Sequence, residues 1–167
     1  MGVVIVFGGK AVYIELDSIF GNEGADKSFS YDFVLEDELI SSPVRVTGKV
    51  FNKTGIVRLT ADAVYTLSTV CARCTAPILR DVHVEIDHEL IAHAENEDND
   101  FYIVVENMRL DLDALVSEDI FLAMPFRFLC KESCKGLCSI CGADLNKTEC
   151  GCKKPTDPRW DALKNLL

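Results

Sequence analysis

Cysteine is the residue type in this sequence whose number and spacing point most directly to chemistry. The chain of 167 residues has eight cysteines, two of them in the pair Cys71-x-x-Cys74 and six between Cys130 and Cys152. Four thiolates around one ion are the usual ligand set of a structural zinc site. Eight thiols complete two such sites, so we expect two structural zinc ions. The predicted metal ligands are Cys71, Cys74, Cys130, Cys134, Cys138, Cys141, Cys150 and Cys152.

The spacing favours one way of sharing these ligands between two ions. The four cysteines from Cys138 to Cys152 would close a loop of about 15 residues, and a short loop costs little chain entropy. The remaining four would then join the Cys71 pair to the Cys130–Cys134 segment. The alternative pairing exchanges Cys130 and Cys134 with Cys138 and Cys141, and it stays open. In the Cys138-x-x-Cys141-Gly142 motif, glycine is expected to let the chain turn back beneath the metal.

Other uses of the cysteines fit the sequence less well. A disulfide between near neighbours such as Cys150 and Cys152 would be strained. A rubredoxin-like iron site, for redox chemistry or metal sensing, is an alternative, although one half of the pattern here is Cys-Gly-Cys. A catalytic zinc normally keeps an open position for substrate, and an all-thiolate site leaves none. Because phosphate-binding and nucleophile motifs are also not seen, we expect no enzyme and no small-molecule substrate.

The charge of the chain bears on its partners. A net charge of −10 opposes binding to nucleic acid, because phosphate contacts depend on Lys and Arg. Basic residues gather near the cysteines, where they would serve either direct RNA contact or a solvated rim around anionic thiolate sites. These residues are Arg73, Arg127, Lys131, Lys135, Lys147, Lys153, Lys154 and Arg159. The sequence lacks an apolar run of about 18 residues and a signal-peptide pattern, so we expect a cytoplasmic protein without a membrane segment.

Alternating apolar and polar residues predict the strands that must position these ligands. The predicted strands are residues 28–35, 44–52, 56–70, 77–90 and 101–105. A hairpin turn is expected at Lys53–Gly55. The Cys71 pair lies between the two longest strands, which places it at the tip of a hairpin. A helix is predicted over residues 111–124, with Asp111 as its N-cap and Pro125 ending it.

The same patterns predict which side chains face the core and which face solvent. One face of strand 28–35 should carry Phe29, Tyr31, Phe33 and Leu35. The stripe of the helix that faces the core should carry Leu112, Leu115, Val116, either Asp119 or Ile120, and Ala123. We expect His88 in the core, and His83 and His93 in solvent. Residues 1–27 have no single clear pattern: a strand at 3–7, a strand or short helix over 11–20 and a turn or loop at 21–26 are the interpretations.

Together these elements predict an α+β fold: an antiparallel sheet, as a sandwich or open barrel, covered by one helix and followed by a cysteine-rich zinc-binding segment. Residues 1–125 are expected to form the β domain. Residues 126–167 are expected to form the zinc-binding segment, which ends in a short helix that begins near Asp157.

Three stretches carry a family resemblance. The stretches VCARCTAPI after a long strand, LDLDALVSEDIFLAMP, and LCKESCKGLCSICGADLN followed by Cys-Gly-Cys and DPRWDALKNLL resemble the YceD family of large-subunit ribosomal RNA accumulation proteins. The resemblance covers about residues 28–167. It implies a role in synthesis, processing or stability of large-subunit ribosomal RNA, with ribosome-assembly proteins or the pre-ribosomal large-subunit particle as partners. It also implies that the Cys71 pair shares its ion with Cys130 and Cys134.

Overall fold

The computed structural model of the protein describes residues 11–93 and 102–152. These residues form two compact units. The first contains residues 11–68, 79–93 and 102–126, and the second contains residues 69–78 and 127–152. The hairpin tip that carries Cys71 therefore groups with the cysteine-rich segment, whereas the predicted boundary at residue 125 leaves the tip in the β domain. The interpretations for residues 3–7 and for the helix near Asp157 lie outside the described residues.

The first unit is built on a five-stranded sheet with the order β2-β3-β4-β5-β6. The strands are β2 Asp26–Phe33, β3 Val44–Lys53, β4 Ile56–Val70, β5 Pro77–Ile91 and β6 Tyr102–Val104. β3 pairs antiparallel with both β2 and β4, as the alternation predicts. β6 instead pairs parallel to β5, so the sheet is mixed at this edge. The α+β class is confirmed.

A second, two-stranded sheet and two short helical segments also belong to this unit. β1 Tyr13–Glu15 pairs antiparallel with β7 Arg109–Asp111. The helix α1 Asp17–Phe20 follows β1, and the 3-10 turn η1 Glu106–Met108 precedes β7. The region 11–20 thus contains both a strand and a helix. Two successive positive φ angles, 54° at Thr54 and 84° at Gly55, form the predicted hairpin turn between β3 and β4.

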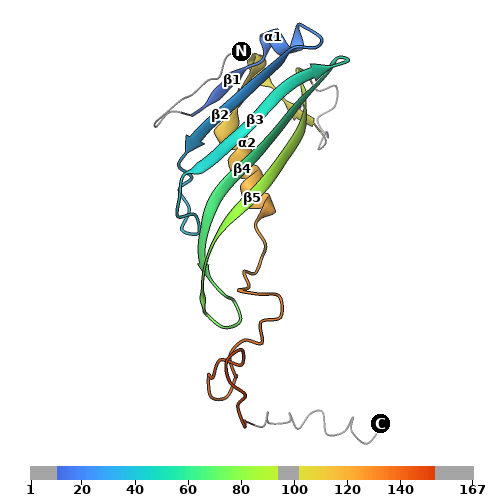
Figure 1. Ribbon diagram of the computed structural model, residues 1–167. Coiled ribbons are helices and arrows are strands. Elements are labelled where there is room, and N and C mark those ends of the chain that lie inside the picture. Colours follow the sequence, from blue (N-terminus) through green and yellow to red (C-terminus); the bar gives the residue numbers. More distant parts are fainter. Residues whose placement is uncertain (1–10, 94–101, 153–167) are drawn as a thin grey trace, which may run out of the picture. The chain divides into compact units, whose positions relative to one another are not determined.

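The helix α2 Leu112–Ala123 lies against one face of the sheet (Figure 1). Asp111 is its N-cap, since the carboxylate accepts a hydrogen bond from the Ala114 N–H at 3.0 Å. The predicted stripe is buried at Leu112, Leu115, Val116 and Ile120. Ala123 is exposed, so its placement in the stripe was wrong: it lies in the last turn, beyond the end of the buried face. In the described part of the chain, no helix is long and apolar enough to cross a membrane.

The core lies between α2 and the apolar face of the sheet. Val46, Val50 and Leu59 are fully buried there, as the alternation predicts. Leu35 lies two residues beyond the end of β2 and is only half-buried, so its placement on the strand face was wrong. His88 points from β5 toward α2, with its Nε2 at 2.9 Å from a carboxylate oxygen of Asp119.

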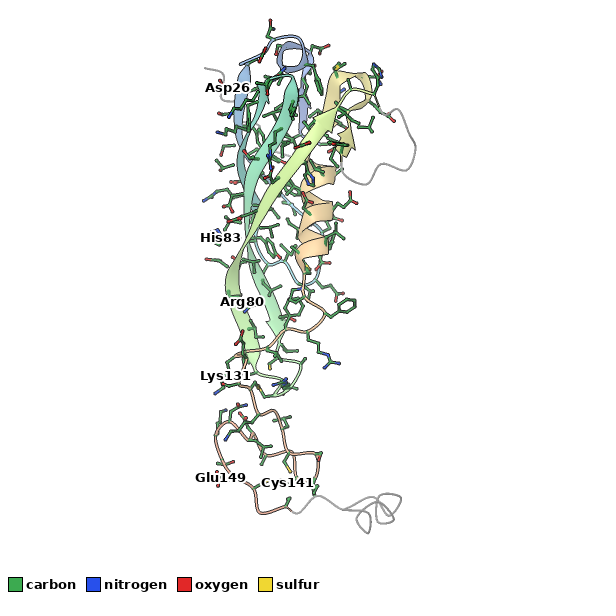
Figure 2. All side chains as sticks on the ribbon, turned by 90° about the vertical axis from the view of Figure 1, so that its right-hand side faces the viewer. Asp26, Arg80, His83, Lys131, Cys141 and Glu149 are labelled. Carbon is green, nitrogen blue, oxygen red and sulfur yellow. The ribbon has the colours of Figure 1, made fainter. Side chains whose placement is uncertain are left out.

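The opposite face of the sheet is polar. Figure 2 shows His83 on this face, away from α2. His83 and His93 are both exposed, as predicted. Arg45 and Asp32 pair across β3 and β2 at 3.2 Å, and such exposed pairs contribute little to stability. This unit therefore presents a covered face and a hydrated face, and the thiols lie in the other unit.

Candidate metal centres

The loop between β4 and β5 presents the first pair of thiols. The backbone N–H of Cys71 donates to the Ala76 carbonyl at 2.8 Å, and the N–H of Thr75 donates back to the Cys71 carbonyl at 2.9 Å. Thr75 has a positive φ of 57°. These bonds fold residues 71–76 into a tight turn that directs both sulfurs to the same side. The N–H of Ala72 also donates to the Phe128 carbonyl at 2.9 Å, which brings the second stretch of this unit alongside.

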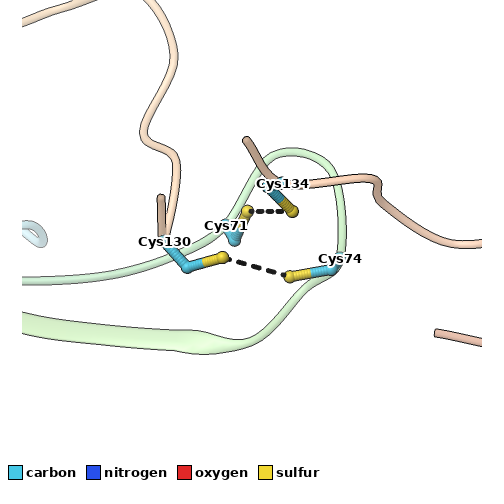
Figure 3. Close-up of side chains that lie close together, drawn as sticks. All are labelled: Cys71, Cys74, Cys130 and Cys134. Atoms are coloured by element: carbon cyan, nitrogen blue, oxygen red, sulfur yellow. Dashed lines mark hydrogen bonds between the residues drawn. The ribbon is translucent and has the colours of Figure 1, made fainter. Parts of the chain in front are cut away.

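The first group of sulfurs consists of Cys71, Cys74, Cys130 and Cys134, called here the hairpin tetrad. All four sulfurs lie within 4.8 Å of one another. Figure 3 shows Cys71 facing Cys134, at 3.8 Å between sulfurs, and Cys74 facing Cys130, at 3.6 Å. A tetrahedral zinc ion with bonds of about 2.3 Å requires sulfurs about 3.8 Å apart. The observed separations therefore fit a tetrathiolate zinc site.

This tetrad is largely shielded from water. Cys71, Cys74 and Cys134 are 1%, 7% and 3% exposed, and only Cys130 is open to solvent. Ile78 is buried with them, and Phe128 and Leu129 pack against the cluster. Four close thiols beside apolar side chains favour a bound cation, which would neutralise their thiolate charges out of contact with water. The chemistry of this donor set therefore suits a closed metal site.

The second group consists of Cys138, Cys141, Cys150 and Cys152, called here the loop tetrad, and its sulfurs also lie within 4.8 Å of one another. The N–H of Gly142 donates to the Cys138 carbonyl at 2.9 Å, and the N–H of Cys138 donates to the Ala143 carbonyl at 2.8 Å. The N–H of Ile140 points at the Cys138 sulfur, at 3.5 Å. Cys141 and Cys152 are exposed. The loop tetrad is thus a second potential four-thiolate site, more open to solvent.

The sulfurs group as loop-closure entropy favours. The pairing that exchanges Cys130 and Cys134 with Cys138 and Cys141 does not match this grouping. A short local loop closes the second tetrad at low entropic cost, whereas the first tetrad joins segments about 60 residues apart.

Backbone N–H groups lower the pKa of a thiol in each tetrad. Those of Cys130, Arg73 and Cys74 lower the pKa of Cys71 to about 6. Those of Cys141 and Ile140 lower the pKa of Cys138 to about 6. Although Cys130 is exposed as a residue, desolvation of its sulfur beside the neighbouring thiols raises the pKa of Cys130 to about 12. Four sulfurs so close together cannot all carry negative charge without a cation, so a divalent metal would bind as the remaining protons leave.

Two glycines of this unit have left-handed backbone conformations, for different reasons. Gly142 has φ +71°, and a Cβ built there meets no protein atom within 4 Å, so its conformation rather than space favours glycine. Gly136 has φ +76°, and a Cβ there would lie 3.0 Å from the carbonyl oxygen of Arg73. No local pattern marks Gly136, because that contact joins residues distant in the chain.

Arg73 also has a role that the sequence did not indicate. It was grouped with the basic residues available to partners, yet its Nη1 donates to the Cys134 carbonyl at 2.8 Å. Its own carbonyl accepts the N–H of Leu137 at 3.0 Å. Arg73 therefore joins the hairpin tip to the Cys134 segment by two hydrogen bonds. Lys131, Lys135 and Lys147 are exposed, as a solvated rim or a contact surface requires.

Comparison with known proteins identifies the family. The family model for large ribosomal RNA subunit accumulation protein YceD matches residues 59–167, which is more than half of the chain. Uncharacterized proteins of Mycobacterium tuberculosis and Mycobacterium bovis are 30% identical over 148 residues, covering 85% of this chain and 64% of theirs. The chain thus spans less than two thirds of the length of these relatives.

A plant relative has an informative name. The chloroplastic large ribosomal RNA subunit accumulation protein YCED homolog 1 of Arabidopsis thaliana is 32% identical over 62 residues, covering 36% of this chain and 19% of that protein. No solved structure matches the chain. On the family match over residues 59–167, the chain belongs to the YceD family of large ribosomal RNA subunit accumulation proteins.

Proposed function

We propose that this protein is a zinc-binding factor for the accumulation of large-subunit ribosomal RNA. The observation that carries the proposal is the presence of two tetrads of sulfurs, spaced for tetrahedral metal binding, in a chain of the YceD family. The family name supports a role in ribosomal RNA accumulation, and the tetrads support metal binding by thiolates. We further propose that the protein acts in the cytoplasm, where thiols stay reduced and available to zinc.

The role of zinc in this proposal is structural. An ion in the hairpin tetrad would join the β4–β5 loop to the segment that carries Cys130 and Cys134. An ion in the loop tetrad would close residues 138–152 on themselves. Structural zinc contributes on the order of 10 kcal/mol to the folding of small domains, so removal of the metal should unfold the second unit. Because four thiolates leave no coordination position for substrate, we propose a non-enzymatic role.

The proposed partners are ribosome-assembly proteins or the pre-ribosomal large-subunit particle. The negative charge of the chain favours contacts with proteins over extended contacts with RNA. The exposed Lys131, Lys135 and Lys147 are the observation that favours a second candidate, direct contact with RNA. Binding to ribosomal RNA fragments at increasing salt separates the two: a steep loss of affinity with salt supports RNA contact, and no binding supports a protein partner.

Metal analysis of purified variants tests the zinc sites. We expect a colourless protein with two zinc ions, because a ferric tetrathiolate site would be red. Cys71→Ser should remove one ion, Cys150→Ser the other, and the double variant both. Loss of the same single ion in both variants, with the double variant still holding one, would contradict the two tetrads.

The biological part of the proposal needs its own measurement. Cells depleted of the protein should have a lower ratio of large- to small-subunit ribosomal RNA. The wild-type chain should restore this ratio, and the Cys71→Ser and Cys150→Ser double variant should not. An unchanged ratio in depleted cells would refute the proposed role while leaving the metal sites intact.

A further inference from the structure

One side chain in the second unit connects the two tetrads. Asn146 lies in the loop between Cys141 and Cys150, which belongs to the loop tetrad, yet its amide contacts the hairpin tetrad. Its Nδ2 donates to the Cys134 sulfur at 3.3 Å. Its amide oxygen accepts the backbone N–H of Lys135 at 3.0 Å. A hydrogen bond from N–H to a metal-bound thiolate orients the ligand and stabilises its charge.

The orientation of this amide is set by its surroundings. The second Nδ2 hydrogen points to a carboxylate oxygen of Asp144 at 2.9 Å, and the same oxygen accepts the Asn146 backbone N–H at 3.0 Å. Both amide hydrogens and the amide oxygen are therefore used. Aspartate at this position would place a carboxylate oxygen against a thiolate and a second carboxylate. The site thus selects an asparagine amide.

The loop that carries Asn146 is anchored at both ends by ligands of the loop tetrad. Cys138 and Cys141 precede it, and Cys150 and Cys152 follow it. Within the loop, the N–H of Leu145 donates to the Gly136 carbonyl at 3.0 Å, which adds one backbone tie to the segment near the hairpin tetrad. A metal in the loop tetrad would hold both ends of the loop together, and so restrict the position of Asn146.

The two tetrads also differ in access. Three of the four sulfur residues of the hairpin tetrad are buried, whereas Cys141 and Cys152 of the loop tetrad are exposed. A chelator or an exchanging ligand reaches the loop tetrad first. The loop tetrad, which is the more accessible site, is therefore also the site whose metal would restrict the position of Asn146.

We propose that the two metal sites are energetically coupled through Asn146, which acts as a positioning residue for Cys134. This inference rests on the proposed binding of metal to both tetrads. Metal in the exposed loop tetrad holds Asn146 in place and strengthens binding at the buried hairpin tetrad. Loss of that metal frees the loop and weakens the hairpin site, so the protein responds to metal supply as a unit. By linkage, each occupied site strengthens the other by the same factor.

A double-mutant cycle on the full chain tests this coupling. Cadmium serves as the probe metal, because cadmium NMR gives a separate signal for each site, assigned with Cys71→Ser and Cys150→Ser. Competition with a chelator then measures the affinity of the hairpin site alone. The two changes in the cycle are Asn146→Ala and removal of the loop site by Cys150→Ser with Cys152→Ser. Glu149→Gln, an exposed change in the same loop, is the matched control.

Each change should weaken cadmium binding at the hairpin site about tenfold, the lower end of the effect of losing a ligand's hydrogen-bond partner. The combination should also weaken it about tenfold, because both changes remove the same support. The control should leave the affinity unchanged. Asn146→Asp, which keeps the size and the acceptor for the Lys135 N–H, should weaken the site at least as much as Asn146→Ala. Both Asn146 variants should still bind two cadmium ions at saturation.

Three results would overturn the proposal. An effect of about a hundredfold in the combined variant would mean that the two changes act independently. An Asn146 variant that binds at the hairpin site as tightly as the wild type would remove the positioning role. In both cases the wild-type chain still binds two metals, so the proposed zinc-binding function stands. Failure of the wild-type chain to bind metal would remove both the coupling and the proposed function.

Discussion

Replacing Gly136 by alanine tests how closely the hairpin tip packs on the Cys134 segment. Gly136 lies between the ligands of the two tetrads and has φ +76°. A new Cβ would lie 3.0 Å from the Arg73 carbonyl oxygen and 3.3 Å from the Arg73 Cβ. The carbonyl oxygen is backbone that already accepts the Leu137 N–H, so it cannot move aside without loss of that bond.

The free-energy cost of Gly136→Ala has two contributions, the backbone conformation and the contact with Arg73. Alanine variants of two other glycines in the same unit distinguish these contributions. The left-handed conformation costs about 1–2 kcal/mol for a residue with a Cβ. The contact with Arg73 adds about 1 kcal/mol, the lower end of the range for overpacking. Gly142→Ala carries only the first part, because φ is +71° and a Cβ there meets nothing. Gly151→Ala carries neither part, because Gly151 lacks a positive φ and its Cβ also meets nothing.

The assay is chelator competition for zinc on the purified chain, since folding of this unit and metal binding are linked. A cost of about 2–3 kcal/mol for Gly136→Ala corresponds to a loss of roughly 30- to 150-fold in zinc affinity. Gly142→Ala should show a smaller loss, and Gly151→Ala should match the wild type.

The order of the zinc affinities of the three variants tests whether the hairpin tip packs on Gly136. Equal affinities for Gly136→Ala and Gly142→Ala would show that the Arg73 contact carries no free energy. A Gly136→Ala variant as tight as Gly151→Ala would refute both parts, and with them the packing of the hairpin tip on this segment.

Two further predictions concern helix α2. Asp111→Ala removes the N-cap and should lower the free energy of unfolding by about 1 kcal/mol, measured by thermal or urea unfolding; Glu118→Ala, an exposed change in the same helix, should have a much smaller effect, and equal effects would contradict the capping role. Burial raises the pKa of Asp113, although the Val12 N–H opposes the shift. Because the folded state favours the protonated form, stability from this carboxyl falls as pH rises from its unfolded pKa of about 4 through the raised folded pKa. Asp113→Asn should therefore gain stability relative to the wild type across that interval, and a pH-independent difference in melting temperature would refute this.

The family match and the tetrads support different parts of the proposed role. The match over residues 59–167 includes the hairpin tip and all eight cysteines, so the family assignment and the proposed metal sites rest on the same region. The two proposals about metal, the zinc sites and their coupling, are tested by metal binding rather than by ribosomal RNA levels. Their outcome therefore does not depend on the identity of the partner.

Local patterns in the sequence were enough to predict much of this protein. Apolar and polar residues alternate along most of β3, β4 and β5, since one face of each strand is buried and the other is exposed to water. Asp111 marks the start of α2, because an N-cap is recognised by its own side chain. The cysteines are predicted as metal ligands from their residue type and spacing. The short loop from Cys138 to Cys152 favours the grouping of sulfurs that the structure has.

Only the tertiary structure decided the contacts between residues far apart in the chain. β6 joins β5 in parallel, a choice that alternation in three residues does not encode. Gly136 is constrained by Arg73, and Asn146 donates to Cys134 from the loop of the other tetrad. Each residue alone is typical of a turn or loop. Their roles follow from which segments lie side by side, and no local pattern reports that.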